Sequence, residues 1–248
     1  DISKVRILLG LVPEVRGVRL NADDLDDQGR TALHYATEMG HVEVCKELLM
    51  AAPEIISHKA KGLFGSTALH TAAANGQRET VAFLISRDAD VMLKNDNGST
   101  PLHVAAGLGD VEICRRLLQA NAPVDSYAND GRTSLHVAVQ NGHRSVAGLL
   151  INHNANVNAV TLRGENALHI AAAAATSHPD TVQWLLQGGC DPDLEREDSK
   201  RPLTMLCAMI TDMALLDLQG EEPYWVPEEV FVPEIDLSDP TIAPRREG

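Results

Sequence analysis

Aromatic residues are scarce in this sequence: Phe, Trp and Tyr make up 3% of its 248 residues, although 44% of the residues are hydrophobic. A core with so few rings must be filled by Ala, Leu, Val and Ile. These side chains suit closely packed small helices better than a β-sandwich or a β-barrel. The composition therefore favours an all-α fold.

Basic residues are also in deficit, with 21 Lys and Arg against 35 Asp and Glu, which gives a net charge of −14. Nucleic acid phosphates and anionic membranes would repel such a chain. The sequence contains no GxSxG, no Gly-rich phosphate loop and no HExxH. We therefore expect no enzymatic activity, no cofactor, no direct nucleic acid binding and no membrane binding. The charge favours another protein as the partner, contacted through a basic or extended segment.

The four cysteines lie far apart and form no CxxC pair. Cys45 and Cys114 stand within apolar helical patterns, where a buried thiol acts as a small hydrophobic side chain. Apolar runs of membrane-spanning length and a signal peptide are both lacking. We interpret the chain as a reduced cytoplasmic or nuclear protein.

A tetrad recurs along the chain: TALH at 31–34 and at 67–70, TPLH at 100–103, TSLH at 133–136 and NALH at 166–169. The spacings are 36, 33, 33 and 33 residues, and a weaker sixth copy, RPLT, stands at 201–204. Periods of this length indicate stacked structural repeats rather than one globular core.

Each copy predicts two helices. Thr100 is a good N-cap and Pro101 suits the first helical position. Gly109 supplies the left-handed residue that ends this helix, and Asp110 caps the next. The second helix ends at Asn121, a residue type that tolerates positive φ. Asp88 and Asn154 occupy the same place in neighbouring copies.

The repeats resemble ankyrin repeats, in which a β-turn loop, two antiparallel helices and a connecting loop follow one another. The resemblance implies an all-α solenoid. We expect a partial N-terminal repeat helix and long loop at 1–25, five repeats at 26–193, a degenerate capping repeat at 194–218 and an acidic, Pro-rich tail at 219–248. Repeat two gains three residues near ISHKAKGLFG, and repeat five gains two at AAAAATSHPD.

The histidines that end the tetrads are interpreted as structural, since in the resembling family this side chain hydrogen-bonds backbone groups of adjoining loops. A shared metal is excluded by spacing, because packed helices lie about 8–10 Å apart, whereas zinc needs histidine nitrogens at about 2 Å. The residues concerned are His34, His70, His103, His136 and His169.

The resemblance also implies protein binding, as a scaffold or adaptor, on the concave face formed by turn tips and first helices. Met39, Leu63, Phe64 and Leu108 are large apolar residues that stacking does not need, and Phe64 is the preferred anchor. An alternative is that Leu63 and Phe64 pack only within the lengthened loop. The candidate binding residues are Arg30, Met39, Leu63, Phe64, Asn75, Asn97, Leu108, Asp130, Arg132, Gln140, Leu162 and Arg163.

Two other functions remain open. With its acidic tail the chain also resembles inhibitory ankyrin proteins, which implies an inhibitor or regulator of a transcription factor. Alternatively, the repeats could be the targeting domain of a larger enzyme. The aromatic residues of the tail, Tyr224, Trp225 and Phe231, either fold back onto the last repeat or form a short linear motif.

Overall fold

The computed structural model describes residues 21–173 and 179–194. The chain divides into two units, Asp1–Cys207 and Ala208–Gly248, and the described residues belong to the first. Several predictions therefore lie outside the described residues: most of the partial helix and long loop at 1–25, the insertion around 174–178, the degenerate repeat from 195 onward and the tail at 219–248.

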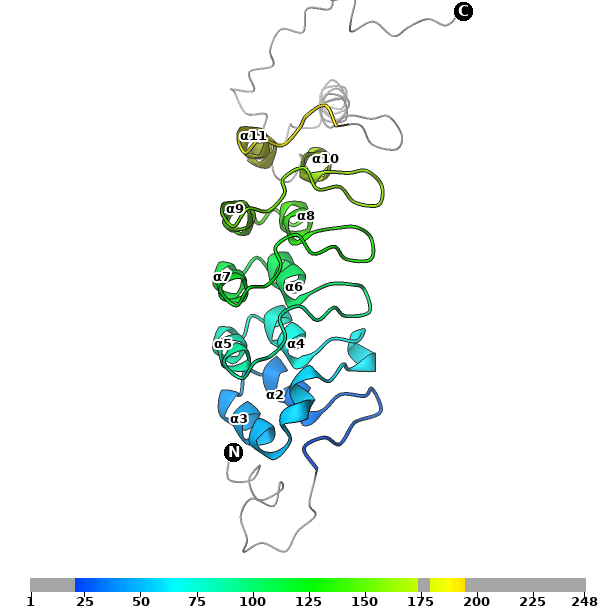
Figure 1. Ribbon diagram of the computed structural model, residues 1–248, viewed down its shortest axis with the longest axis vertical. Helices are drawn as coiled ribbons and strands as arrows, with labels where there is room; N and C mark the ends of the chain where they lie inside the picture. The colour runs from blue at the N-terminus through cyan, green and yellow to red at the C-terminus, as the bar shows by residue number, and fades with distance from the viewer. Residues whose placement is uncertain (1–20, 174–178, 195–248) are drawn as a thin grey trace, which may run out of the picture. The chain divides into compact units, whose positions relative to one another are not determined.

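The described part confirms an all-α solenoid of helix pairs, with no β-strand among its residues. The first helices of repeats one to five contact one another in a row, and so do the second helices of repeats one to four (Figure 1). The first helices are α2 (Ala32–Glu38), α4 (Ala68–Ala74), α6 (Pro101–Leu108), α8 (Ser134–Gln140) and α10 (Ala167–Ala173). The second helices are α3 (Val42–Ala51), α5 (Arg78–Ser86), α7 (Val111–Gln119), α9 (Arg144–Asn152) and α11 (Pro179–Gln187).

The capping residues and the left-handed residues that were predicted at the helix ends are confirmed. Thr100 begins α6 in a capping box, in which His103 takes the role that Glu or Gln commonly has. Asp110 accepts hydrogen bonds from the backbone N–H groups of Glu112 and Ile113 at the start of α7. Gly109 has φ +83°, and Asp88, Asn121 and Asn154 have φ of +60° to +63°.

Leucines at equivalent places in each repeat form the core. They belong to one hydrophobic cluster that runs through the five described repeats, so that no repeat buries its apolar face alone. Full burial of such a side chain stabilises the fold by roughly 1.5–3 kcal/mol. The tetrad leucines, all at most 1% exposed, are Leu33, Leu69, Leu102, Leu135 and Leu168, and those of the second helices, at most 3% exposed, are Leu48, Leu84, Leu117, Leu150 and Leu185.

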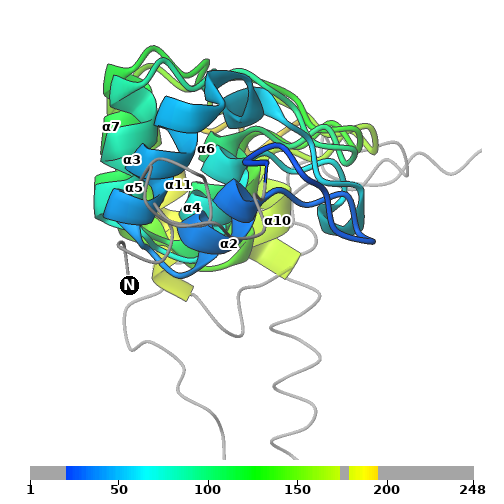
Figure 2. The ribbon, with the colours of Figure 1, turned by 90° about the horizontal axis from the view of Figure 1, so that it is seen from below.

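The turn tips, which are residues 26–30, 60–66, 95–99, 128–132 and 161–165, project beyond the first helices and lie side by side (Figures 1 and 2). Backbone hydrogen bonds join each tip to the next. Asp96 N–H donates to the Phe64 carbonyl (2.8 Å), and Asn129 N–H donates to the Asn97 carbonyl (3.0 Å). The tips therefore form a fixed row rather than separate loops.

The tetrad histidines provide a second link between repeats. Nε2 of His34, His70 and His103 lies 3.0–3.2 Å from the backbone carbonyl of the residue before the next tetrad. A carbonyl only accepts, so these rings carry their hydrogen on Nε2, and Nδ1 accepts from the backbone N–H of the tetrad Thr. His136 keeps the Nδ1 bond, and backbone groups of Ala159 and Glu165 act on its imidazole, although its buried Nε2 makes no hydrogen bond of standard geometry within the described part of the chain.

Candidate partner-binding groove

A shallow groove of about 250 Å³ lies between the turn tips and the first helices of repeats one to three. Its walls come from all three repeats. Arg30 and Glu38 belong to repeat one, Leu63, Phe64 and Asn75 belong to repeat two, and Val104 belongs to repeat three.

The tip of repeat two is longer than its neighbours. The hydrogen bond that closes it, from Ala60 N–H to the Ser66 carbonyl (3.0 Å), spans seven residues, whereas the bond from Asn95 N–H to the Ser99 carbonyl (2.9 Å) spans five. A short 3₁₀ helix, η2 (Lys61–Leu63), fills the difference. Two of the three inserted residues therefore lie in the tip itself, and they bring Leu63 and Phe64 to the groove.

Phe64 has an uncommon backbone conformation. Its φ of 52° and ψ of 44° are left-handed, which is strained for a bulky side chain. Two backbone hydrogen bonds hold it there: Phe64 N–H donates to the Lys61 carbonyl (3.2 Å), and the Phe64 carbonyl accepts from Asp96 N–H (2.8 Å). The residue is nevertheless 68% exposed. A strained, exposed aromatic side chain on a fixed backbone is a candidate contact residue.

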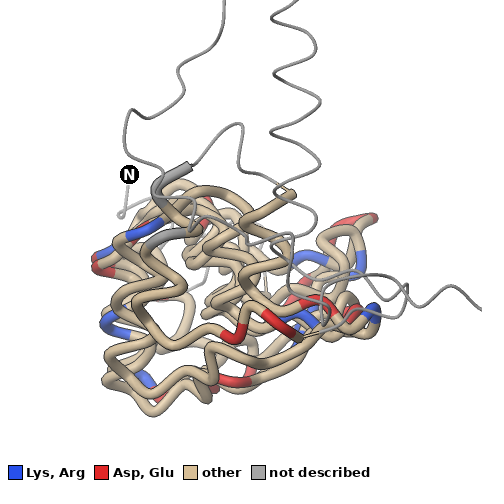
Figure 3. Tube along the Cα trace, turned by 90° about the horizontal axis from the view of Figure 1, so that it is seen from above, with Lys and Arg blue, Asp and Glu red and all other residues tan. Residues whose placement is uncertain are grey.

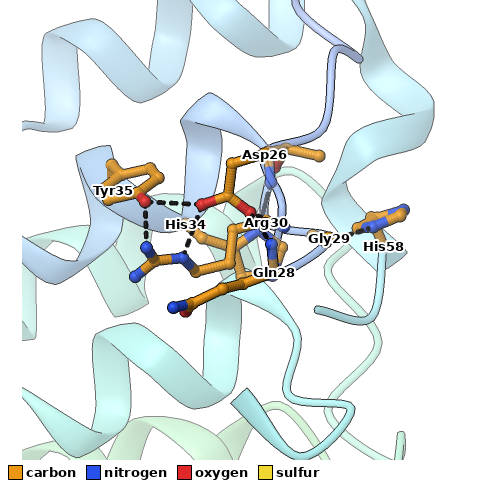
Figure 4. Close-up of polar contacts among 8 residues, drawn as sticks. Asp26, Gln28, Gly29, Arg30, His34, Tyr35 and His58 are labelled. Carbon is orange, nitrogen blue, oxygen red and sulfur yellow. Dashed lines mark hydrogen bonds and ion pairs between the residues drawn. The ribbon is translucent and has the colours of Figure 1, made fainter. Parts of the chain in front are cut away.

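Arg30 is held at the groove by two neighbours (Figure 4). Its Nε donates to Asp26 Oδ2 (3.0 Å), its guanidinium stacks on the Tyr35 ring (4.2 Å to the centroid), and Nη2 donates to the Tyr35 hydroxyl. Tyr35 in turn donates to Asp26 Oδ2 (2.6 Å). This last bond lowers the pKa of Asp26 and raises that of Tyr35. The three side chains form a closed polar triangle at one end of the groove.

His70 lies in the floor of the groove and is electrically neutral near pH 7. Burial lowers the pKa of its imidazole to about 4. Its Nε2 is bound to the Ser99 carbonyl (3.0 Å) and its Nδ1 to Thr67. Among the described residues, no group of His, Cys, Asp and Glu is arranged to hold a metal ion.

The predicted binding residues fall into three sets. Arg30, Leu63, Phe64 and Asn75 line the groove together. Met39 and Leu108 are 64% and 45% exposed but do not line it. The rest lie toward repeats three to five: Asn97, Asp130, Arg132, Leu162 and Arg163 on the turn tips, and Gln140 at the end of α8.

Arg132 and Gln140 are bound to each other, which limits what either offers a partner. Arg132 Nη1 donates to Gln140 Oε1 (2.6 Å), and Arg132 Nε lies 3.4 Å from Asp130 Oδ2. Among the residues that the structure describes, Leu162 is the most exposed large apolar residue, at 69%, but it stands two repeats away from the groove. The groove therefore lies beside the lengthened tip of repeat two, away from these residues.

Three residues at the groove are not among the predicted binding residues. Asp26 and Tyr35 orient Arg30, and Val104 closes the apolar wall from repeat three. The spacing of Asp26, Arg30 and Tyr35 carries no signal of this contact, because the pairing of charges four residues apart is a rule for helices, whereas residues 26–30 form a turn tip. Val104 carried no signal that set it apart from the core.

Comparison with known proteins gives a family. A family model described as ankyrin repeats (3 copies) matches residues 1–58, 51–128, 69–161 and 109–196. The human transient receptor potential cation channel subfamily A member 1 is 35% identical over 72 residues, which cover 29% of this chain and 6% of that protein. The match thus spans a small fraction of the relative's length.

In the described part of the chain, no helix has the length and apolar character needed to cross a bilayer. The family matches together cover residues 1–196, and the described repeats have the helix pairs and tip loops expected of that family. The chain therefore belongs to the ankyrin-repeat family, whose repeats are in general protein–protein interaction modules and typically non-enzymatic.

Proposed function

We propose that this chain is a scaffold or adaptor that binds an extended segment of another protein along the groove of repeats one to three. The observation that carries the proposal is Phe64, which is 68% exposed on a backbone fixed in a strained conformation beside the groove. Strained residues cluster at binding sites. There, a strained conformation that costs stability is retained because it serves the function.

The energetics favour such an anchor. An aromatic ring buried by a partner is the commonest kind of binding hot spot, and its truncation typically costs more than 2 kcal/mol, roughly a thirtyfold change in Kd. The tip backbone is already ordered by its hydrogen bonds to repeat three. Little backbone conformational entropy is therefore lost at Phe64 on binding.

We also propose a reducing compartment, either cytoplasm or nucleus. The thiols of Cys45, Cys114 and Cys190 are free and buried. Burial raises the pKa of Cys45 and Cys114 to about 12 and that of Cys190 to about 11, so none is a reactive thiolate. Structural thiols kept reduced are typical of intracellular proteins.

The first prediction concerns Phe64→Ala in the full chain. Partners are captured with the wild-type chain, identified by mass spectrometry, and remeasured as purified proteins by calorimetry. We expect Phe64→Ala to raise the Kd of a directly binding partner at least tenfold. The melting temperature should stay nearly unchanged, because the ring is mostly exposed.

Met50→Ala is the matched control, since Met50 is 57% exposed on the second helix α3 and does not line the groove. This variant should bind like the wild type. A partner whose affinity is equally unaffected by both substitutions would place the binding surface elsewhere and contradict the proposal. A large drop in melting temperature for Phe64→Ala would instead show that the ring belongs to the core.

A further inference from the structure

We infer that the groove selects a segment in which a Lys or Arg side chain stands close to a large apolar side chain. The inference rests on the proposed function and adds the chemistry of the partner. It follows from the charges and hydrogen-bond acceptors that line the groove.

Three titratable side chains line the groove: Arg30, His70 and Glu38. The first two add no net charge to it near pH 7. Arg30 is balanced by Asp26, with Nε and Oδ2 3.0 Å apart. His70 is neutral, since burial lowers its pKa to about 4. The third, Glu38, is exposed and belongs to none of the ion pairs of the described residues. The groove therefore presents one uncompensated carboxylate.

Asn75 adds a neutral acceptor to the same lining. Its Nδ2 donates to the Thr71 carbonyl (2.9 Å), which orients the amide so that its oxygen remains available. Glu38 is held from the neighbouring repeat, because Gln77 Nε2 donates to its backbone carbonyl (3.0 Å). A carboxylate and an amide oxygen together suit a cation with several N–H donors, which is what Lys and Arg provide.

The apolar part of the lining comes from the tip of repeat two and from repeat three. Leu63 and Val104 are half-buried, and Phe64 is largely exposed. An apolar side chain of the partner placed here removes apolar area from water without losing a hydrogen bond of the groove. The occupant therefore needs both side-chain types within the span of one groove of about 250 Å³.

Long-range charge acts in the same direction. The whole chain carries −14, and acidic residues occur on the turn tips as well as on the helices (Figure 3). Basic residues also occur on the tips, so the field there is mixed rather than uniformly negative. A basic segment is nevertheless attracted by the net charge, and the Glu38 and Asn75 oxygens then fix where its cation stops.

The test is selection from a library of random linear peptides displayed on phage, with the full chain as bait. Wild type should enrich peptides with a Lys or Arg at a fixed offset from a large apolar residue. Glu38→Gln should still enrich the apolar residue but lose the basic preference. A selected peptide should lose about tenfold in affinity to Glu38→Gln, and the loss should shrink at high salt. Glu43→Gln, at an exposed acid in the first turn of α3, should behave like wild type.

The outcomes separate the two proposals. Peptides that depend on Phe64 but show no basic preference, or prefer acidic residues, overturn this inference and leave the proposed function standing. A basic preference that survives Glu38→Gln also overturns it, whatever Glu43→Gln does. Failure to select any peptide that depends on Phe64 counts against the proposed function itself, and the inference falls with it.

Discussion

Single residues were predictable where one conformational requirement decides the residue type. Asp88, Asn121 and Asn154 stand where the second helix ends, and their positive φ followed from residue type and position. Phe64 also has positive φ, and no propensity predicts this for Phe. Its conformation is imposed by hydrogen bonds to Lys61 and Asp96, one of them from the next repeat. A long-range constraint of this kind leaves no local pattern in the sequence.

The strain at Phe64 separates stability from binding. Glycine adopts a left-handed backbone at no steric cost, whereas alanine retains the strain of Phe, so Phe64→Gly should be more stable than Phe64→Ala by about 1 kcal/mol. Both variants remove the ring, so both should lose a directly binding partner equally. Urea unfolding followed by circular dichroism measures the difference. If Phe64→Ala is the more stable of the two, the tip does not hold a left-handed residue at this position.

At the scale of elements, the helices were predictable because capping residues, glycines and apolar spacing agree within each copy. For the insertion in repeat two, the sequence predicts the number of extra residues but not their place in the fold. Two of its residues lengthen the tip, from Ala60 to Ser66, and form η2, while the third lies before the tip. Which loop takes the extra residues depends on the neighbouring tips, because they fix the backbone bonds that must be kept.

The close nesting of the tips gives a prediction on two equivalent glycines. Gly29 and Gly131 occupy the same place in their tips, with φ of +70° and +79°. An added Cβ at Gly131 would lie 2.5 Å from the backbone nitrogen of Leu162 in the next tip, whereas at Gly29 the nearest atom, Lys61 N, is 3.5 Å away. Both alanine variants carry the strain of positive φ, about 1 kcal/mol.

Gly131→Ala should therefore be less stable than Gly29→Ala by a further 1–3 kcal/mol or so, because the tip of repeat five must move to admit the methyl group. Urea unfolding of both variants under the same conditions measures this. Equal losses would mean that the tips are not nested in solution as they are here.

At the scale of the whole molecule, repetition made the fold predictable, because each repeat contacts its neighbours in the same way and several copies carry the same information. The groove was less predictable. Arg30, Leu63, Phe64 and Asn75 could be chosen as positions that stacking leaves free, but their convergence on one groove depends on the longer tip of repeat two. Met39 and Leu108 were equally good candidates from the sequence and lie outside it.

The tetrad histidines also act on the whole stack, through pH. Burial lowers the pKa of His34 and His103, and lowers that of His70 and His136 to about 4. In the unfolded chain a histidine titrates near 6.5. Between these values the unfolded state binds more protons than the folded state, so the free energy of unfolding rises with pH. The stability is complete above about pH 6.5 and is lost on acidification toward pH 4.

We therefore expect the urea midpoint to fall steadily from about pH 7 to about pH 5. Over this range the free energy of unfolding should fall by up to roughly 1 kcal/mol per histidine per pH unit. Carboxylates do not account for this window: hydrogen bonds from Tyr35 and Arg116 lower the pKa of Asp26 and Glu112, so their effect is lost only at lower pH. His136→Gln removes one titrating ring and should make the slope shallower. A midpoint that is flat over this range would show that the histidines are not buried in neutral form, because rings already charged in the folded stack bind no further protons on unfolding.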